Sequence, residues 1–182
     1  FDPLRAEAKD AIRALHACGI SKVVMMTGDN RRTAASVAEE VGVDEFYAEV
    51  LPEDKAAFIR REKAAGRTVI MIGDGVNDSP ALSEADAGVA ISTGAAIARE
   101  IADITIASED LFELVTLRRI AEALMGRIHR NYRFIVGFNL GLIVFGVAGL
   151  LPPTTSALLH NASTLAISLK SMTNLLPDKK KI

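Results

Sequence analysis

The sequence predicts a doubly wound α/β domain followed by a two-helix transmembrane hairpin, and two observations lead to this prediction. Over roughly the first 125 residues, short apolar runs alternate with amphipathic helical patterns, which is typical of a parallel sheet covered by helices. Residues 134–169 then contain no Asp, Glu, Lys or Arg. As one helix this stretch measures about 54 Å, enough for two crossings of a bilayer.

The composition excludes several classes of protein. Of the 182 residues, 49% are hydrophobic and 24% charged, which argues against a disordered chain. The 21 basic residues are balanced by 23 acidic ones, a net charge of −2, so a broadly basic nucleic-acid binder is not expected. Cys18 is the single cysteine, which excludes an intrachain disulfide and a multi-cysteine metal site.

The elements follow from local signals, in chain order. Asp2-Pro3 begins a helix that Gly19 ends, and a helix at residues 31–41 ends before Gly42, as N-caps, N1 prolines and C-terminal glycines predict. The remaining expected elements are strands at 22–26, 68–72, 87–91 and 103–107, and helices at 53–65, 95–101 and 111–129. The run at 68–72 (TVIMI) has no polar alternation, so we expect it to be buried on both faces.

The second part of the chain is expected to form the hairpin. We predict domains at residues 1–125 and 126–182, with spans at about 133–151 and 156–176 joined at Pro152-Pro153. Arg127, Arg130 and Arg133 precede the first span, and Lys179 to Lys181 follow the second. Both ends should therefore be cytosolic in a plasma membrane, with the lipid bilayer as a partner. The alternative is a buried helical hairpin of a soluble protein.

Three polar clusters lie at strand or helix ends. They are TGDN at 27–30, LPEDK at 51–55 and GDGVND at 73–78. Taken singly, each is equally well explained as a turn or a helix start. Together they supply a hydroxyl and backbone N–H groups for phosphate, a lysine for its charge, and carboxylates with an asparagine for Mg²⁺. The clusters therefore favour phosphoryl chemistry.

These motifs resemble the phosphorylation domain of heavy-metal-transporting (class IB) P-type ATPases, which has a haloacid-dehalogenase-like fold. The resemblance covers essentially the whole chain and includes the GDGVNDSPAL run. It implies an incomplete domain of that fold and export of a divalent ion through an aspartyl phosphate. It also implies that the chain is the C-terminal part of a pump, with Mg²⁺ and ATP as cofactors.

The resemblance assigns roles to individual residues. Thr27, Gly28 and Asp29 match the phosphate-binding TGD loop, and Lys55 matches the lysine that neutralises the phosphoryl group. Asp74 and Asp78 match the Mg²⁺ ligands, Asn77 completes that shell, and Gly73 and Gly75 shape its loop. The physical expectation is an in-line displacement driven by positioning and charge neutralisation.

Other parts of the family pattern do not occur in this sequence. There is no DKTGT motif to supply the nucleophilic aspartate, and nothing matches the actuator domain or the nucleotide-binding domain that holds most of the ATP. We therefore expect the missing N-terminal domains of the same pump as partners and an inactive chain on its own. The alternatives are a membrane-anchored phosphatase of the same fold and a non-catalytic membrane fragment.

A polar group inside the second span is the candidate site for the transported divalent metal ion. His160, Asn161 and Thr164 share roughly one face of that helix, and Asn139 lies in the first span. Interhelical hydrogen bonding explains such residues as well as metal binding does, but the resemblance favours an ion site. Imidazole suits Zn²⁺ or a similar divalent ion. The absence of cysteine from this span disfavours Cu⁺.

Overall fold

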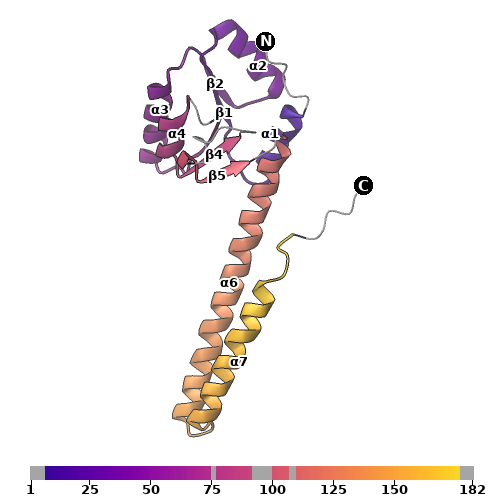
Figure 1. Ribbon diagram of the computed structural model, residues 1–182, viewed down its shortest axis with the longest axis vertical. Coiled ribbons are helices and arrows are strands. Elements are labelled where there is room, and N and C mark those ends of the chain that lie inside the picture. Colours follow the sequence, from indigo (N-terminus) through magenta and orange to yellow (C-terminus); the bar gives the residue numbers. More distant parts are fainter. Residues whose placement is uncertain (1–6, 75–76, 92–99, 107–109, 177–182) are drawn as a thin grey trace. The chain divides into compact units, whose positions relative to one another are not determined.

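The structure, a computed structural model, describes residues 7–74, 77–91, 100–106 and 110–176. It divides the chain into two compact units, residues 1–116 and 117–182. Figure 1 gives the order of the elements, and each unit is described on its own below.

The first unit has parallel strands connected by helices. Strand β1 (Val24–Met26) pairs with β2 (Glu45–Tyr47), and β3 (Ile70–Gly73), β4 (Ala87–Ile91) and β5 (Ile104–Ile106) pair in that order. Both pairings of β4 are parallel, as is that of β1 with β2. The predicted α/β fold with parallel strands is therefore confirmed.

The helices of this unit begin and end at the residues that local chemistry favours. They are α1 (Ala8–Ala17), α2 (Arg31–Val41), α3 (Pro52–Ala64) and α4 (Ser79–Glu84). The side-chain oxygen of Asn30 accepts a 3.0 Å hydrogen bond from the Thr33 N–H, and Gly42 ends α2 with a φ of 76°. Glycine adopts this left-handed conformation without the steric cost of a Cβ. Helix α2 therefore has the predicted bounds.

A small apolar core joins α3 and α4 to β3. Ile59, Met71, Ala81 and Leu82 form a buried cluster, and Met26, Val69, Ala85 and Ile101 pack against it. A Cβ on Gly88 would lie 2.7 Å from the Leu82 carbonyl oxygen, so β4 approaches α4 closely because this residue is glycine. The core thus sets where α4 begins relative to the end of β3.

The strands differ from the sequence expectations in two ways, an element that was missed and an expected burial that is wrong. Strand β2 was not expected, and β3 is not buried on both faces, because Ile70 and Ile72 are 45% and 39% exposed while Met71 is 8% exposed. In the part of the chain that the structure describes, one face of β3 packs on the core cluster and the other remains open. The start of the predicted first helix and most of the helix at 95–101 lie outside the described residues.

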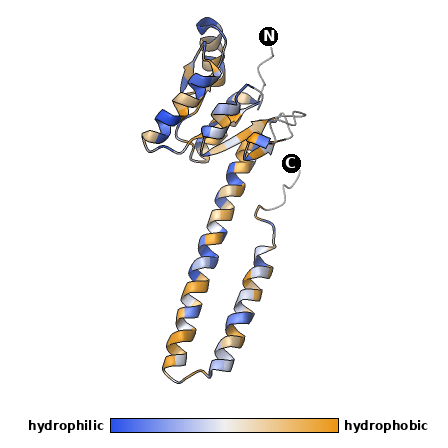
Figure 2. Cartoon of the chain, turned by 60° about the vertical axis from the view of Figure 1, so that its left-hand side comes forward, coloured by the Kyte–Doolittle hydropathy of each residue, from blue (hydrophilic) through white to orange (hydrophobic). Residues whose placement is uncertain are grey.

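Helices α6 (Phe112–Val147) and α7 (Pro153–Ser171) make up the second unit, except for the first turn of α6. The expected helix at 111–129 and the expected first span are thus one continuous helix. Gly149, with a φ of 75°, lies in the turn, and Pro153 begins α7. The two helices run side by side in opposite directions (Figures 1 and 2).

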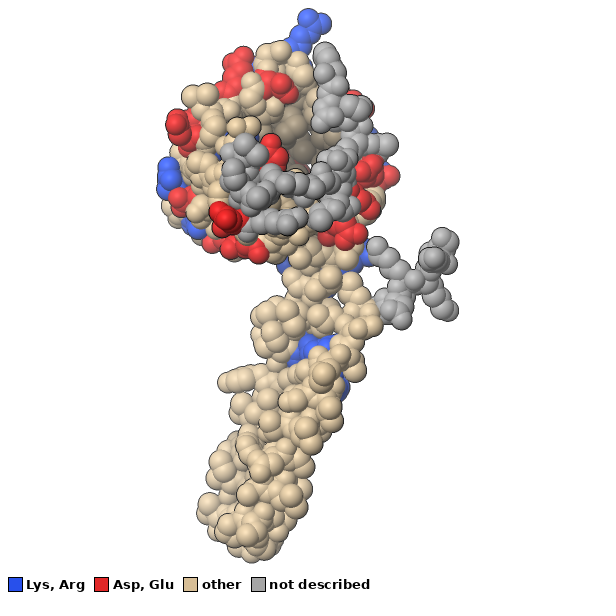
Figure 3. All heavy atoms as spheres, viewed as in Figure 1, with Lys and Arg blue, Asp and Glu red and all other residues tan. Residues whose placement is uncertain are grey.

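The surface of the helix pair is largely apolar. Among residues 117–176, Leu142 alone is buried, at 7% exposure. Figure 2 shows hydrophobic residues dominating the half of α6 that leads to the turn. On the face drawn in Figure 3, the same end carries no charged side chain. No helix among the described residues combines the length and apolar character of a membrane span, so the transmembrane hairpin stays a prediction.

Candidate functional site

The TGD loop directly after β1 is held by backbone hydrogen bonds to the segment after β2. The Thr27 N–H donates to the Tyr47 carbonyl at 3.0 Å, and the Thr27 carbonyl accepts from the Val50 N–H at 3.0 Å. The Glu49 N–H donates to the Asp29 carbonyl at 2.9 Å. Glu49 itself has a φ of 56°, a left-handed conformation that is uncommon for a residue other than glycine. The two segments therefore form one connected loop structure.

Within the TGD loop, Thr27 and Asp29 bind each other. The Thr27 hydroxyl donates to Asp29 Oδ2 at 3.0 Å and accepts from the Asp29 N–H at 3.1 Å. Nothing lies within 4 Å of the position that a Cβ of Gly28 would occupy. The loop therefore presents a hydroxyl and a carboxylate that are already oriented, with open space beside its glycine.

Lys55 and Asp78 form an ion pair between the start of α3 and the start of α4. Lys55 Nζ lies 2.7 Å from Asp78 Oδ1, and the two side chains are only 14% and 13% exposed. Lys55 comes from the first turns of α3, and Asp78 is the N-cap residue of α4. Charge-assisted hydrogen bonds of this length, partly shielded from water, are stronger than exposed ones. The contact therefore links two sequence motifs that are 23 residues apart.

Gly73 makes room for the Asp78 carboxylate at the end of β3. A Cβ on Gly73 would lie 2.6 Å from Asp78 Oδ2 and 2.8 Å from Asp78 Cβ. Such distances do not occur between real atoms, so any larger residue at position 73 would displace the carboxylate. Asp74 directly follows and is exposed, as is Asn77, while Gly75 lies outside the described residues.

The core relates the TGD loop to this carboxylate pair. Met26, the last residue of β1, packs against the cluster that contains Met71 of β3. Thr27 follows Met26 directly, and Asp74 follows the last residue of β3. Polar residues at the carboxyl ends of parallel strands are where ligands bind in open α/β sheets. The sequence-predicted site residues of the first unit thus follow segments that share one core.

The oxygens of Asp74 and Asp78 fit Mg²⁺. This ion favours oxygen ligands and is usually held by one or two carboxylates together with phosphate oxygens and water. Within the described residues no group of three or more His, Cys, Asp or Glu side chains is placed to hold a metal. Two carboxylates, one of them fitted against a bare glycine, would therefore hold the ion together with water and phosphate oxygens.

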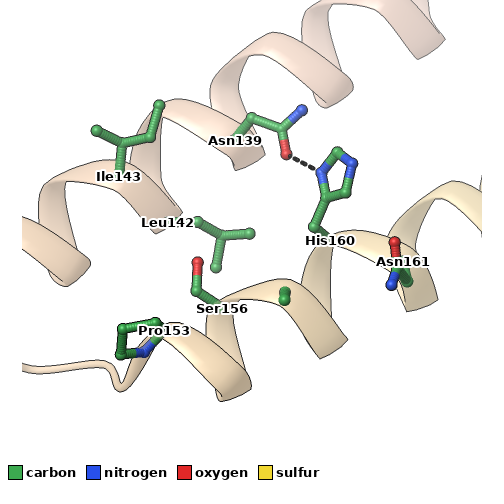
Figure 4. A pocket seen from close by; sticks show the side chains of 8 residues that line it. Asn139, Leu142, Ile143, Pro153, Ser156, His160 and Asn161 are labelled. Carbon is green, nitrogen blue, oxygen red and sulfur yellow. Dashed lines mark hydrogen bonds between the residues drawn. The ribbon is translucent and has the colours of Figure 1, made fainter.

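The second unit brings His160 and Asn139 together. His160 Nδ1 lies 2.8 Å from Asn139 Oδ1 across the helix pair (Figure 4). They line an open cavity of about 530 Å³, together with Leu142, Ile143, Pro153, Ser156, Ala157 and Asn161. Thr164 is oriented differently, because its hydroxyl donates to the His160 carbonyl of its own helix at 3.0 Å. The pairing of residues 139 and 160 was not predicted, although both lie at similar separations from the turn.

Asp86 contributes a contact that sequence reasoning missed. Its Oδ2 accepts a 2.8 Å hydrogen bond from the Val69 N–H, and its Oδ1 lies 3.5 Å from Lys63 Nζ. The hydrogen bond, helped by the Lys63 charge and opposed by partial burial, lowers the pKa of Asp86 below its ordinary value. The carboxylate thereby ties the start of β4 to the residue before β3.

Comparison with known proteins identifies the relatives of this chain. A family model described as haloacid dehalogenase-like hydrolase matches residues 1–86. The manganese-exporting P-type ATPase of Mycobacterium tuberculosis is 41% identical over 91% of the chain, and the zinc-exporting P-type ATPase of Mycobacterium marinum 40% over the same share. Copper-transporting ATPase 2 of Rhizobium meliloti is 46% identical over 87% of the chain.

Solved structures agree with these relatives. A crystal structure of a zinc-transporting PIB-type ATPase in the E2.Pi state superposes on 94% of the chain with a TM-score of 0.87 and 34% identity. The chain spans 23% of the manganese and zinc exporters, 19% of the copper transporter and 28% of the crystallised chain. The chain therefore contains a haloacid dehalogenase-like hydrolase domain, its homologues are heavy-metal P-type ATPases, and it spans less than a third of their length.

Proposed function

We propose that this chain is part of an ATP-driven transition-metal cation pump, in which its first unit supplies the Mg²⁺ and phosphate site. The observation that carries the proposal is the Lys55–Asp78 pair at 2.7 Å, with Asp78 fitted against Gly73. It joins two motifs that phosphoryl transfer needs, a cation for the transferring group and a carboxylate for the metal.

Each residue of the first unit then has a definite task. The Thr27 hydroxyl and the loop N–H groups orient phosphate oxygens, and Lys55 neutralises charge on the transferring group. Asp74 and Asp78 hold Mg²⁺, which supplies charge neutralisation at the phosphate, and Asn77 completes that shell. No DKTGT motif occurs in this sequence, so in the proposed pump the attacking aspartate comes from the rest of the same phosphorylation domain and most of the ATP site from another domain.

The second unit, in this proposal, is a pair of transmembrane helices in the plasma membrane with both ends in the cytosol. Support comes from the apolar side chains that α6 and α7 expose, among them Phe134, Ile143, Leu158 and Leu165, each at least 53% exposed. Apolar surface of this extent calls for a lipid or protein environment. The superposition on a zinc-transporting ATPase over 94% of the chain also supports the proposal.

We infer further that Zn²⁺ or a similar divalent ion contacts His160 and Asn139. An imidazole nitrogen and an amide oxygen at hydrogen-bonding distance form part of a borderline ligand set, which suits Zn²⁺ better than Cu⁺. Asn161 and Thr164 are the neighbouring candidates from the same helix. The names of the relatives include manganese, zinc and copper, so the choice of ion rests on the chemistry of these residues.

Phosphoenzyme formation in the longer pump tests the first part of the proposal. Asp74→Ala should abolish phosphorylation by radiolabelled ATP, because a carboxylate that holds the metal at the phosphate is lost. Glu40→Ala, an exposed acidic residue of α2, is the matched control and should retain it. Normal phosphoenzyme levels in Asp74→Ala would refute the assignment.

The alternative of an anchored phosphatase is tested with the 182-residue chain. The proposal expects neither metal-stimulated ATP hydrolysis nor hydrolysis of p-nitrophenyl phosphate, since no aspartate of a DKTGT motif is present to attack. Turnover that disappears in Lys55→Ala would show that the chain has its own nucleophile and would favour the phosphatase.

A further inference from the structure

The C-terminal end of α7 is bound by side chains of α6. One Arg127 nitrogen, Nη1, donates to the carbonyls of Ser171 and Thr173 at 2.9 and 2.6 Å, and Nη2 donates to the Asn174 carbonyl at 2.9 Å. One turn further along α6, Asn131 Nδ2 donates to the Ser171 hydroxyl at 2.9 Å. Two residues of one helix therefore hold the last turn of the other and the segment after it.

The chemistry of this contact suits arginine. The last carbonyls of a helix have no N–H partner within the helix and carry the negative end of its dipole. A guanidinium group is a permanent cation with five donors in a fixed plane, so it can satisfy three carbonyl oxygens at once. Lysine presents a point charge on a flexible chain and would not reproduce this geometry.

The helix pair has few other polar contacts that could set its register. The Asn139–His160 hydrogen bond lies in the half of the pair toward the turn, and the Arg127 and Asn131 contacts lie at the opposite end. The side chains of α6 between Asn131 and Asn139 are mostly apolar. Apolar contacts are non-directional, whereas interhelical hydrogen bonds require defined positions of both partners. The polar contacts at the two ends together therefore fix the position of α7 along the axis of α6 and the rotation of α7 about its own axis.

We propose that Arg127 is a positioning residue that holds α7 in the register at which His160 meets Asn139. This inference rests on the proposed ion site for its functional consequence, while the contact between the helices is independent of it. Arg127 touches neither residue of that site, so it acts through the placement of α7. The sequence alone offered it only as one of several basic residues beside a predicted span.

Distances between spin labels test the register directly. Cys18→Ser removes the native thiol, and nitroxide labels are attached at Leu140→Cys on α6 and Leu165→Cys on α7, both exposed positions. Pulsed electron paramagnetic resonance then measures the distance between the two labels. Arg127→Gln should shift or broaden the distance distribution, Asn131→Ala should do so less, and Arg127→Lys should fall between Arg127→Gln and the parent. The control is Arg130→Gln, which removes an exposed basic side chain three residues further along α6. It should match the parent.

Zn²⁺ stimulation of ATP hydrolysis in the longer pump tests the consequence. Arg127→Gln should raise the half-saturating Zn²⁺ concentration about tenfold, as loss of residues that orient metal ligands commonly does, with little change in kcat. Asn131→Ala should produce the same effect more weakly. A lower kcat in Arg127→Gln with an unchanged half-saturating Zn²⁺ concentration would overturn the positioning role.

The two measurements separate the possible failures. An unchanged label distance in both Arg127→Gln and Asn131→Ala would overturn the register role whatever the pump transports. Alternatively, the label distance changes in the variants, but no divalent ion stimulates the unsubstituted pump. This result would overturn the proposed function and the functional half of this inference. A changed distance with unchanged Zn²⁺ dependence would overturn the functional half of the inference, because His160 would then not depend on the Arg127 contacts.

Discussion

Lys55 Nζ and Asp78 Oδ1 lie 2.7 Å apart and join the helix starts of α3 and α4. The two residues are remote in sequence and belong to separate motifs. Their side chains are mostly shielded from solvent, so neither charge is well hydrated and each depends on the other. The pair therefore places Lys55, the cation proposed to bind phosphate, beside Asp78, a residue proposed to bind Mg²⁺.

Removal of the cation should make the chain depend more on Mg²⁺. Lys55→Met leaves the Asp78 carboxylate without its partner and should lower the free energy of unfolding by about 1–3 kcal/mol. Millimolar Mg²⁺ should then raise the melting temperature of Lys55→Met more than that of the parent, because the ion replaces the missing charge. Thermal melts with and without Mg²⁺ measure this, with Lys9→Met as an exposed control. Equal Mg²⁺ shifts in both proteins would contradict an Mg²⁺ role for Asp78.

Gly73 should tolerate no side chain. Gly73→Ala places a Cβ within 2.6 Å of Asp78 Oδ2 and should cost about 1–3 kcal/mol of stability through overpacking, together with most of the phosphoenzyme formed by the longer pump. Gly28→Ala is the matched control for stability, because its Cβ would meet nothing within 4 Å. Chemical denaturation gives the two free energies. Equal small losses for both substitutions would argue against the packing of Asp78 on Gly73.

The Asp86 carboxylate should make the free energy of unfolding depend on pH in the acidic range. The Val69 N–H, helped by Lys63, lowers the pKa of Asp86 in the folded chain below its ordinary value of 3.8. The unfolded state therefore takes up the proton at a higher pH than the folded state. The stabilisation is fully present well above pH 3.8 and is lost as the pH falls through the folded pKa.

Denaturation curves of the parent and Asp86→Asn measure this dependence. The parent should be the more stable protein near neutral pH, and the difference between the two should shrink as the pH falls below about 4. Glu40→Gln, whose side chain is exposed on α2, controls for the loss of one negative charge. A difference between parent and Asp86→Asn that stayed constant down to pH 2 would contradict the lowered pKa.

His160 should matter for the ion more than for the nucleotide. In the longer pump, His160→Ala should reduce Zn²⁺-stimulated ATP hydrolysis about tenfold or more while ATP binding changes little. Asn139→Ala should do the same more weakly, since it removes the oxygen that faces the imidazole at 2.8 Å. Ser156→Ala, in the same cavity, is the control. Unchanged Zn²⁺ dependence in a folded His160→Ala pump would remove His160 from the ion site.

Sequence alone determined the elements and motifs whose signals are local. The Asn30 cap and Gly42 set α2, and the apolar run at 87–91 became β4 with the predicted bounds. These succeeded because hydrogen bonds and backbone conformations within a few residues decide them. The alternation of strands and helices was likewise sufficient to predict parallel strands.

Tertiary structure decided which remote groups meet. Strand β2, with the sequence EFY and two exposed residues, is too short to show a hydrophobic pattern, and its pairing with β1 defines it. The exposure of Ile70 and Ile72 depends on what covers that face of β3, which periodicity does not encode. The contacts of Lys55 with Asp78, of Asn139 with His160 and of Arg127 with the end of α7 join residues 21 to 47 positions apart. Such pairs depend on the packing of whole elements, and the side chains alone do not specify their partners.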